Sequence, residues 1–246
     1  MIHTSQHIFA LCVPNFWQGS EKPETLKLIH QADLLHRLTK VLRAELHDQF
    51  IFFDRAHHGL VQIVQVSKKD MTVRILNFQV NAQSPGHLTF LLPLLKKEAL
   101  EEAVYSLSEI GVSTIQLVIT QKSRQKLLHE KEFERLQNIV IAAAEQSKNY
   151  IYPDLLAPKK LSDLLLTLDQ SDHKIVFDVA GKSFFDLRKN VLTASKLSVL
   201  VGPEGGFTDT ELGEVNAASF QSCRLTATTL RAVQAVAVGA ALFKII

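Results

Sequence analysis

From His87 onward, short apolar runs alternate with segments of helical periodicity. This alternation restricts the possible folds more than any other feature of the sequence. Such a pattern is typical of a parallel sheet covered by helices on both faces. With 46% hydrophobic residues in a chain of 246, a packed core is also expected. The predicted strands are Leu88–Leu92, Thr114–Ile119, Ile175–Val179, Leu197–Val201 and Cys223–Thr226. The predicted helices include Lys96–Ile110, which Gly111 stops, and a long helix near Glu130–Asn149.

The first third of the chain has a different pattern, which predicts a smaller β-rich domain. Gln49–Asp54, Leu60–Ser67 and Met71–Val80 are short β-branched and aromatic runs separated by polar breaks. Ala82–Gly86 contains Pro and Gly, and the pattern changes after it. We therefore expect one domain over residues 1–82 and a second, α/β domain over residues 83–246.

The segment Leu197–Leu212 combines a strand, a glycine-rich loop and a helix. The apolar run ends at Gly202–Gly206 (GPEGG), and Thr208–Glu211 has the spacing of a capping box that opens a helix. In an open α/β protein, this arrangement puts backbone N–H groups in the crevice beyond the sheet edge, where small ligands bind. The alternative is a tight turn that uses glycine only for its positive φ.

Leu225–Val238 is the second informative segment. Thr228 or Thr229 can cap a helix whose first turn carries Leu230 and Arg231. If its strand neighbours that of the glycine loop, Arg231 points to the same edge of the sheet. The alternative is an ordinary surface arginine.

Asp33–Glu45 predicts an amphipathic helix with one cationic face. His36, Lys40 and Arg43 fall at i, i+4 and i+7, opposite a leucine stripe. Such a face suits contacts with RNA phosphates, which supply affinity without sequence recognition. A solvated polar face is the alternative interpretation.

Other classes of site have little support in the sequence. Cys12 and Cys223 indicate reduced thiols rather than a disulfide scaffold, and ten scattered histidines lack metal-ligand spacing, so we expect no metal. Gly181–Ser183 imitates the end of a phosphate-binding loop, but Val176 occupies its first glycine position. Dinucleotide and nucleophile-elbow motifs are also missing. The N-terminus lacks a signal-peptide pattern, and Val233–Ile246 is shorter than the ~20 residues of a membrane helix.

Taken in order, five segments resemble the bacterial 16S rRNA uridine-N3 methyltransferases (RsmE-like) of the SPOUT superfamily. The complete GPEGG loop is the most specific of them, and the likeness runs over nearly the whole chain. The matching residues are His36, Leu38, Val41, Leu42 and Arg43; Glu109–Val112; Arg135, Ile139 and Ala143–Ser147; Gly202–Gly206; and Leu225, Leu230, Arg231 and Ala235.

The resemblance implies an N-terminal PUA-like β-barrel for RNA and a C-terminal SPOUT-type α/β domain with a trefoil knot, through which two copies dimerise. It also implies S-adenosylmethionine as the methyl donor, 16S rRNA of the small ribosomal subunit as the partner, and a cytoplasmic location. The implied cofactor-binding residues are Leu200, Val201, Gly202, Pro203, Gly205, Gly206, Leu225 and Leu230. The implied RNA-binding residues are His36, Lys40, Arg43, Lys122 and Arg135.

The chemistry of the implied reaction selects the candidate catalytic residues. As N3 of a uridine loses its proton, negative charge develops on the base, and a cation beside a carbonyl oxygen stabilises it. We expect Arg231 to have this role. Glu204 is the candidate carboxylate, either as a base or as a group that holds its loop.

The sequence also departs from the family pattern. The differing positions are Ser106, Lys122, Ala142, Asn149, Thr226–Ala227 and Ala232–Gln234. Thr226 in place of glycine is expected to crowd the cofactor, and Val233 removes a carboxylate that could orient Arg231. The departures favour one alternative on the same scaffold, a non-catalytic RNA-binding or ribosome-assembly protein, and the complete Gly202–Gly206 loop opposes it. A second alternative is a SPOUT enzyme acting on tRNA, which shares the cofactor but not the target. A nucleotide-dependent oxidoreductase is disfavoured because its fingerprint loop is missing.

Overall fold

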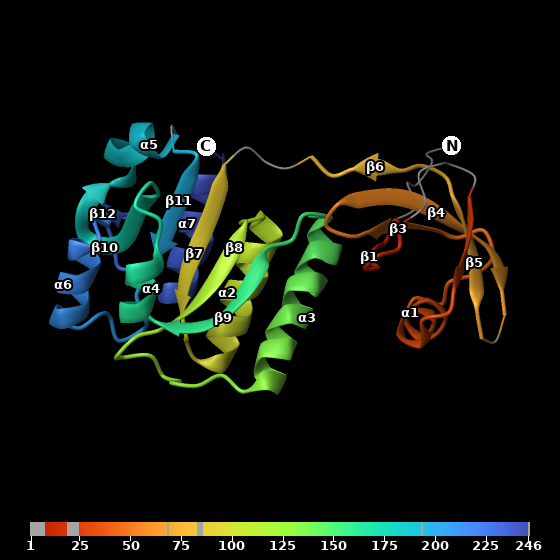
Figure 1. Ribbon diagram of the computed structural model, residues 1–246, viewed down its shortest axis with the longest axis horizontal. Coiled ribbons are helices and arrows are strands. Elements are labelled where there is room, and N and C mark those ends of the chain that lie inside the picture. The colour runs from red at the N-terminus through yellow and green to blue at the C-terminus, as the bar shows by residue number, and fades with distance from the viewer. Residues whose placement is uncertain (1–7, 19–24, 68, 83–85, 193, 246) are drawn as a thin grey trace. The chain divides into compact units, whose positions relative to one another are not determined.

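The computed structural model describes residues 8–18, 25–67, 69–82, 86–192 and 194–245 (Figure 1). Contacts divide the chain into two compact units. The first contains Met1–Gln83 and Ala144–Ile151, and the second contains Ser84–Ala143 and Tyr152–Ile246. Most of the expected linker Ala82–Gly86 lies outside the described residues.

The first unit is built on a six-stranded sheet with the order β1-β3-β4-β5-β2, in which β6 pairs with β4. Inward-facing side chains alternate along β4 and β5, because successive residues of a strand point to opposite faces. The strands are β1 (Ala10–Cys12), β2 (Leu26–Ile29), β3 (Gln49–Phe53), β4 (His57–Val66), β5 (Met71–Ile75) and β6 (Gln79–Val80). The predicted β-rich pattern is confirmed, with the run Met71–Val80 divided into two strands.

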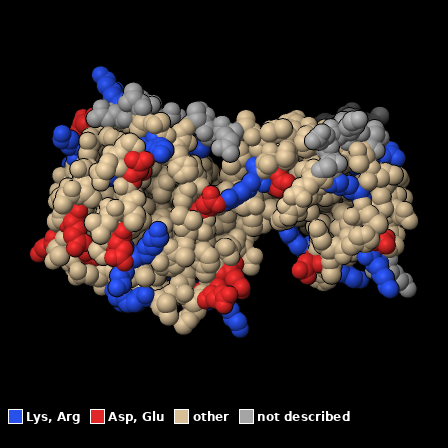
Figure 2. Space-filling view, viewed as in Figure 1, with Lys and Arg blue, Asp and Glu red and all other residues tan. Residues whose placement is uncertain are grey.

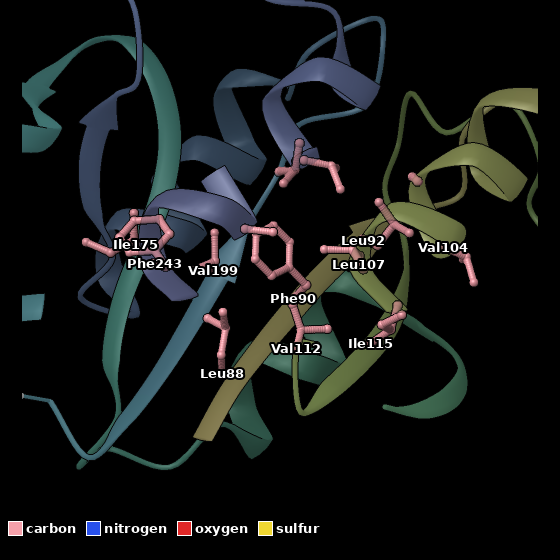
Figure 3. Packing of buried hydrophobic residues seen from close by; sticks show 14 of the residues in the cluster. Leu88, Phe90, Leu92, Val104, Leu107, Val112, Ile115, Ile175, Val199 and Phe243 are labelled. Atoms are coloured by element: carbon pink, nitrogen blue, oxygen red, sulfur yellow. The ribbon is translucent and has the colours of Figure 1, made fainter. Parts of the chain in front are cut away.

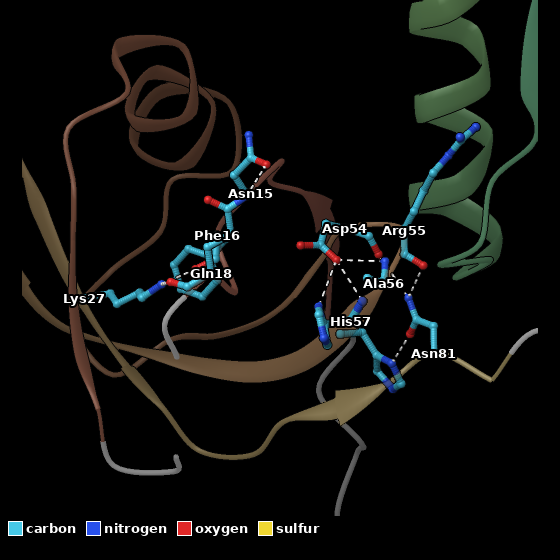
Figure 4. A network of polar contacts seen from close by, with 10 residues as sticks. Asn15, Phe16, Gln18, Lys27, Asp54, Arg55, Ala56, His57 and Asn81 are labelled. Atoms are coloured by element: carbon cyan, nitrogen blue, oxygen red, sulfur yellow. Dashed lines mark hydrogen bonds and ion pairs between the residues drawn. The ribbon is translucent and has the colours of Figure 1, made fainter. Parts of the chain in front are cut away.

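A polar network holds the turn between β3 and β4 (Figure 4). Oδ1 of Asp54 accepts hydrogen bonds from the backbone N–H groups of Ala56 and His57, at 2.9 and 2.7 Å. Asn81, beyond β6, donates to the carbonyl oxygens of Asp54 and Arg55. The turn is therefore fixed by one side chain of its own, Asp54, and by Asn81 from a distant part of the chain.

The predicted continuous helix over Asp33–Glu45 is wrong. An α-helix, α1 (Ala32–His36), passes directly into a π-helical turn, η1 (Arg37–Val41), and Arg43 has a φ of 53°. In the wider turn the N–H of Leu42 donates to the carbonyl of Arg37, five residues earlier. This change of period destroys the i, i+4, i+7 relation on which the expected cationic face depended.

The second unit is a fully parallel six-stranded sheet with the order β12-β10-β11-β7-β8-β9. The parallel sheet expected from the alternation is confirmed, although β9 was not predicted. Its strands are β7 (His87–Pro93), β8 (Thr114–Ile119), β9 (Asp154–Lys160), β10 (His173–Ser183), β11 (Lys196–Leu200) and β12 (Gln221–Arg224).

Helices cover both faces of this sheet (Figure 1). One core cluster joins alternate residues of β7, such as Leu88, Phe90 and Leu92, to α2, α3, α5 and α7 (Figure 3). A second cluster joins Leu91 and Leu200 to α4 and α6 on the opposite face. The helices are α2 (Lys97–Ile110), α3 (Glu130–Ser147), α4 (Leu161–Thr167), α5 (Phe184–Leu192), α6 (Asp209–Ala217) and α7 (Ala232–Ile245). Among the described residues, none of these helices is long and apolar enough to cross a membrane.

Candidate functional site

A cavity of about 820 Å³ lies in the second unit, beyond the carboxyl ends of β11 and β12. This is the edge of an open parallel sheet where ligands bind, and the volume is in the usual range for small-molecule sites. Four segments form its walls, namely the start of α2, the middle of β10, the loop after β11 and the loop after β12. The two segments singled out in the sequence therefore meet in one cavity.

The loop after β11 supplies the glycine-rich wall. Val201, Gly202, Pro203, Glu204 and Gly206 all line the cavity. The N–H of Gly206 donates to the carbonyl oxygen of Pro203 at 2.8 Å, and Gly206 has a φ of 69°, a conformation that favours glycine. The turn therefore presents bare backbone to the cavity. The backbone conformation at position 206 therefore favours glycine.

The predicted capping box at the start of α6 is confirmed. The side chain of Thr208 accepts a hydrogen bond from the N–H of Glu211, and the Glu211 carboxylate accepts one from the N–H of Thr208. The strand, loop and helix expected over Leu197–Leu212 thus occur as predicted.

Glu204 binds the loop to a neighbouring helix. Its Oε1 accepts a hydrogen bond from the N–H of Lys96, the residue before α2, at 3.1 Å. A carboxylate beside the N-terminus of a helix is also stabilised by the helix dipole. Of the two roles expected for Glu204, this contact favours the one in which it holds its loop.

The loop after β12 differs from its prediction. The expected cap at Thr228 or Thr229 is wrong, because α7 begins at Ala232 and the carbonyl of Arg231 accepts the N–H of Ala235. The residues before α7 form a loop, in which the hydroxyl of Thr226 donates to the carbonyl of Thr228 at 2.7 Å. Leu225 and Leu230 line the cavity on this side.

Arg231, the residue immediately before α7, lines the cavity. Its Nε donates to Oε1 of Gln234 at 3.0 Å. Val233 was expected to remove a carboxylate that could orient Arg231, and the role of Gln234 was not predicted. An arginine and a glutamine three residues apart at a helix start are neighbours, so this spacing was an available signal.

A third wall, from β10, was not predicted. Phe177, Asp178 and Val179 line the cavity, because β10 bulges at this point. Phe177 and Lys182 both pair with Cys223, so the residues between them leave the ladder. Glycine inside a strand often marks a bulge, and Gly181 was the signal for this one.

Cys223 borders the cavity but is fully buried in the core cluster. Burial raises the pKa of its thiol to about 11. At neutral pH the side chain is therefore a protonated thiol, which is a poor nucleophile. It contributes packing to the floor of the cavity.

Two expected cofactor contacts are not among the described residues that line the cavity. The side chain of Leu200 points into the core cluster on the α4 and α6 face. Gly205 faces Lys122 instead, since a Cβ placed on it would lie 3.4 Å from the Cβ of that lysine. Strand alternation directs Leu200, the last residue of β11, to the face opposite the one taken by Val199. At Gly205 the contact with Lys122 occupies the space beside the loop.

The expected RNA-binding residues are all exposed, and they come from both units. His36, Lys40 and Arg43 belong to the first unit, while Lys122 and Arg135 belong to the second. Arg135 forms an ion pair with Glu101 at 2.6 Å, which holds the pKa of that carboxyl below its ordinary value. On the face in Figure 2, basic and acidic side chains are interspersed.

Comparison with known proteins identifies a family. The sequence pattern of the RNA methyltransferase domain matches residues 82–244. Ribosomal RNA small subunit methyltransferase E of Synechocystis sp. is 30% identical over 228 residues, covering 84% of this chain and 69% of the relative. The protein of the same name from Aquifex aeolicus is 28% identical and covers 89% and 93% of the two chains.

The fold has a close counterpart among solved structures. Ribosomal RNA small subunit methyltransferase E from Neisseria gonorrhoeae, crystallised with bound S-adenosyl methionine, superimposes with a TM-score of 0.85. The match covers 97% of this chain and 98% of that one at 21% sequence identity, so it supports the fold.

Proposed function

The chain belongs to the RNA methyltransferase family, as an S-adenosylmethionine-dependent rRNA methyltransferase, and from this premise we propose that it methylates N3 of a uridine in 16S rRNA. The observation that carries the proposal is the meeting of the glycine-rich loop and the Arg231 loop in one cavity. Both loops were expected to serve the same reaction from sequence alone.

The residues of the cavity fit the cofactor. Apolar side chains of Phe177, Val201 and Leu225 suit an adenosyl group, and the bare backbone at Gly202 and Gly206 permits close approach. Thr226 was expected to crowd this space, yet the cavity keeps about 820 Å³ with that residue on its wall. When bound, S-adenosylmethionine supplies an activated methyl group on a sulfonium.

Arg231 is the proposed catalytic residue. N3 of uridine lies on the base-pairing edge, so the base must be unpaired or flipped to enter the cavity. As the N3 proton passes to solvent water, negative charge spreads onto the carbonyl oxygens of the uracil. Arg231, held by Gln234, stabilises that charge, and a preorganised donor of this kind is effective because it does not need to reorient.

In this proposal the two parts of the chain have different functions. Residues 1–82 form a PUA-like barrel that binds RNA, and residues 83–246 form the methyltransferase domain. The methyltransferase domain contains the trefoil knot, and two copies associate through it. The sheet order, in which β11 lies between β10 and β7, supports a chain path of this type. The reaction takes place in the cytoplasm, where rRNA and ribosomal particles are found.

The test is a methyl-transfer assay with a defined RNA. Small ribosomal particles and naked 16S rRNA from cells lacking this gene are incubated with the protein and labelled S-adenosylmethionine. Methyl transfer to a single uridine, detected as a block to reverse transcription, is the expected result. Binding of S-adenosylmethionine without transfer to rRNA, or transfer to tRNA, would contradict the proposal.

The proposed RNA contacts make a separate prediction. The double variant Lys40→Ala and Arg43→Ala is expected to bind rRNA about tenfold more weakly and to flatten the salt dependence of binding, because a protein that has lost two phosphate contacts releases fewer counterions when it binds. Filter binding over a range of salt concentrations measures both effects. Lys69→Ala, which removes an exposed charge elsewhere in the same unit, is the control. An unchanged slope in the double variant would assign Lys40 and Arg43 to ordinary solvation.

A further inference from the structure

Glu211 is a buried carboxylate with more contacts than a helix cap requires. Its side chain is 3% exposed. Oε2 accepts hydrogen bonds from the N–H of Thr208 at 2.9 Å and from the hydroxyl of the same residue at 3.2 Å. Oε1 turns the other way and accepts the N–H of Gln121 at 2.6 Å. The first pair of contacts belongs to the capping box, and the contact with Gln121 joins a different part of the chain.

Gln121 lies in the loop that follows β8, and this loop is internally fixed. The N–H of Thr120 donates to Oγ of Ser123 at 3.0 Å, and the two hydroxyl oxygens lie 2.8 Å apart. Both of these side chains are buried. The loop after β8 is therefore a rigid support for whatever it contacts.

The same support also touches the glycine-rich loop directly. Nζ of Lys122 donates to the carbonyl oxygen of Phe207 at 3.1 Å. The side chain of Lys122 lies against Gly205, where an added Cβ would come within 3.4 Å of its Cβ and Cδ. The loop after β8 thus contacts the cofactor loop from Gly205 to Thr208, and Glu211 is the buried link between them.

We propose that Glu211 is a positioning residue, which fixes the glycine-rich loop in its cofactor-binding shape by tying it to the loop after β8. This inference rests on the proposed function, because it assigns the loop to S-adenosylmethionine. A loop containing Gly202, Gly205 and Gly206 has many accessible conformations. If the free protein does not already restrict them, the loss of conformational entropy on binding lowers the affinity for the ligand. The buried carboxylate supplies that restriction before the cofactor binds.

The decisive variant is Glu211→Gln. A glutamine amide has one acceptor oxygen where the carboxylate has two, so it cannot accept from the N–H groups of both Thr208 and Gln121. Because the link between the loops needs both of these contacts, it is lost. We expect the Kd for S-adenosylmethionine, measured by calorimetry, to rise roughly tenfold, the size associated with one charge-assisted hydrogen bond. In the methylation assay, KM for the cofactor rises in parallel, and kcat changes less than KM.

A matched control is Thr208→Ala, which weakens the cap and leaves the Gln121 contact in place. It is expected to lower the free energy of unfolding, as loss of a cap does, while Kd stays within about twofold. If both variants weaken cofactor binding in proportion to their loss of stability, Glu211 serves the helix alone and the proposal is overturned. A Glu211→Gln protein that binds the cofactor as tightly as the wild type overturns it as well.

Lys122→Met tests the same support if Glu211→Gln does not fold. Methionine keeps the packing against Gly205 and removes the ammonium group that binds Phe207. An increase in Kd for the cofactor in the absence of RNA supports the proposal, and an unchanged Kd contradicts it. Failure of the wild-type protein to bind S-adenosylmethionine would instead refute the proposed function, so the two failures are distinguishable.

Discussion

Arg231→Ala is expected to lower kcat for rRNA methylation by about a hundredfold to a thousandfold, the usual effect of removing one donor that stabilises a developing oxyanion. Arg231 immediately precedes α7 and lines the cavity, and its Nε donates a hydrogen bond to Gln234. Binding of S-adenosylmethionine is expected to change by less than about threefold, because the charge that Arg231 stabilises lies on the base in the transition state and not on the bound cofactor. Single-turnover methylation and calorimetry measure the two quantities separately.

Two further variants distinguish catalysis from structure at this position. Arg231→Lys keeps the positive charge without the fork of donors, so we expect partial activity. Gln234→Ala removes the partner of Nε and is expected to have a smaller effect on kcat than Arg231→Ala. Wild-type turnover in the Arg231→Ala protein would remove this residue from the mechanism.

Gly181→Ala is expected to lower the free energy of unfolding by roughly 1–3 kcal/mol, as overpacking of an ordered site does. A Cβ at this position would lie 2.6 Å from the backbone nitrogen of Cys223 and 2.7 Å from the carbonyl oxygen of Ser222. Neither atom belongs to a flexible side chain, so β10 and β12 must separate. Since the bulge in β10 carries Asp178 and Val179 to the cavity, weaker cofactor binding should accompany the loss of stability.

The same substitution at another glycine provides the control. Gly213 lies inside α6, is exposed, and has no atom within 4 Å of an added Cβ. Gly213→Ala should raise the free energy of unfolding by about 0.5–1 kcal/mol, because alanine has the higher helix propensity. Urea denaturation of both variants measures the contrast. Equal effects at the two positions would show that the close backbone approach at Gly181 is not restrictive.

The sequence predicted those parts of the fold that periodicity encodes. The strand Thr114–Ile119 occurs with the predicted bounds, and the other predicted strands of the α/β half occur within a few residues of theirs. Apolar runs bounded by turn residues are a local signal, and burial on both faces of a parallel sheet reinforces it. The predicted helix at Lys96–Ile110 likewise ends where Gly111 adopts a φ of 88°.

Segments governed by particular hydrogen bonds were not predictable in this way. The π-helical turn at Arg37–Val41 has the composition of an ordinary amphipathic helix, so periodicity alone could not reveal it. Strand β9, Asp154–Lys160, contains Pro158 and exposed polar residues, and it joins the sheet as the partner of β8. Its assignment depends on a neighbour that is distant in sequence.

In the candidate site, too, the features encoded by local sequence were predicted and those that depend on distant contacts were not. The glycine-rich loop could be found because glycine and a capping box have local meaning, and Arg231 was found by its place beside a helix start. Asp178 and Val179 were missed, since they lie in the bulge in the pairing of β10 with β12, which the sequence analysis did not predict. Phe177, the last paired residue before that bulge, was missed with them. Gln234 was missed because the expected orienting group was a carboxylate.

The cavity is built from segments that lie far apart in the sequence, and this has a consequence during synthesis of the chain. The cavity combines α2 residues near Lys96 with wall residues up to Ala235, and α7 packs against α2. Contacts between such distant segments form slowly, and none of them can form before the later segment has left the ribosome. A nascent chain therefore has no pocket for the methyl donor. The pocket is complete only after the residues up to Ala235 have left the ribosome.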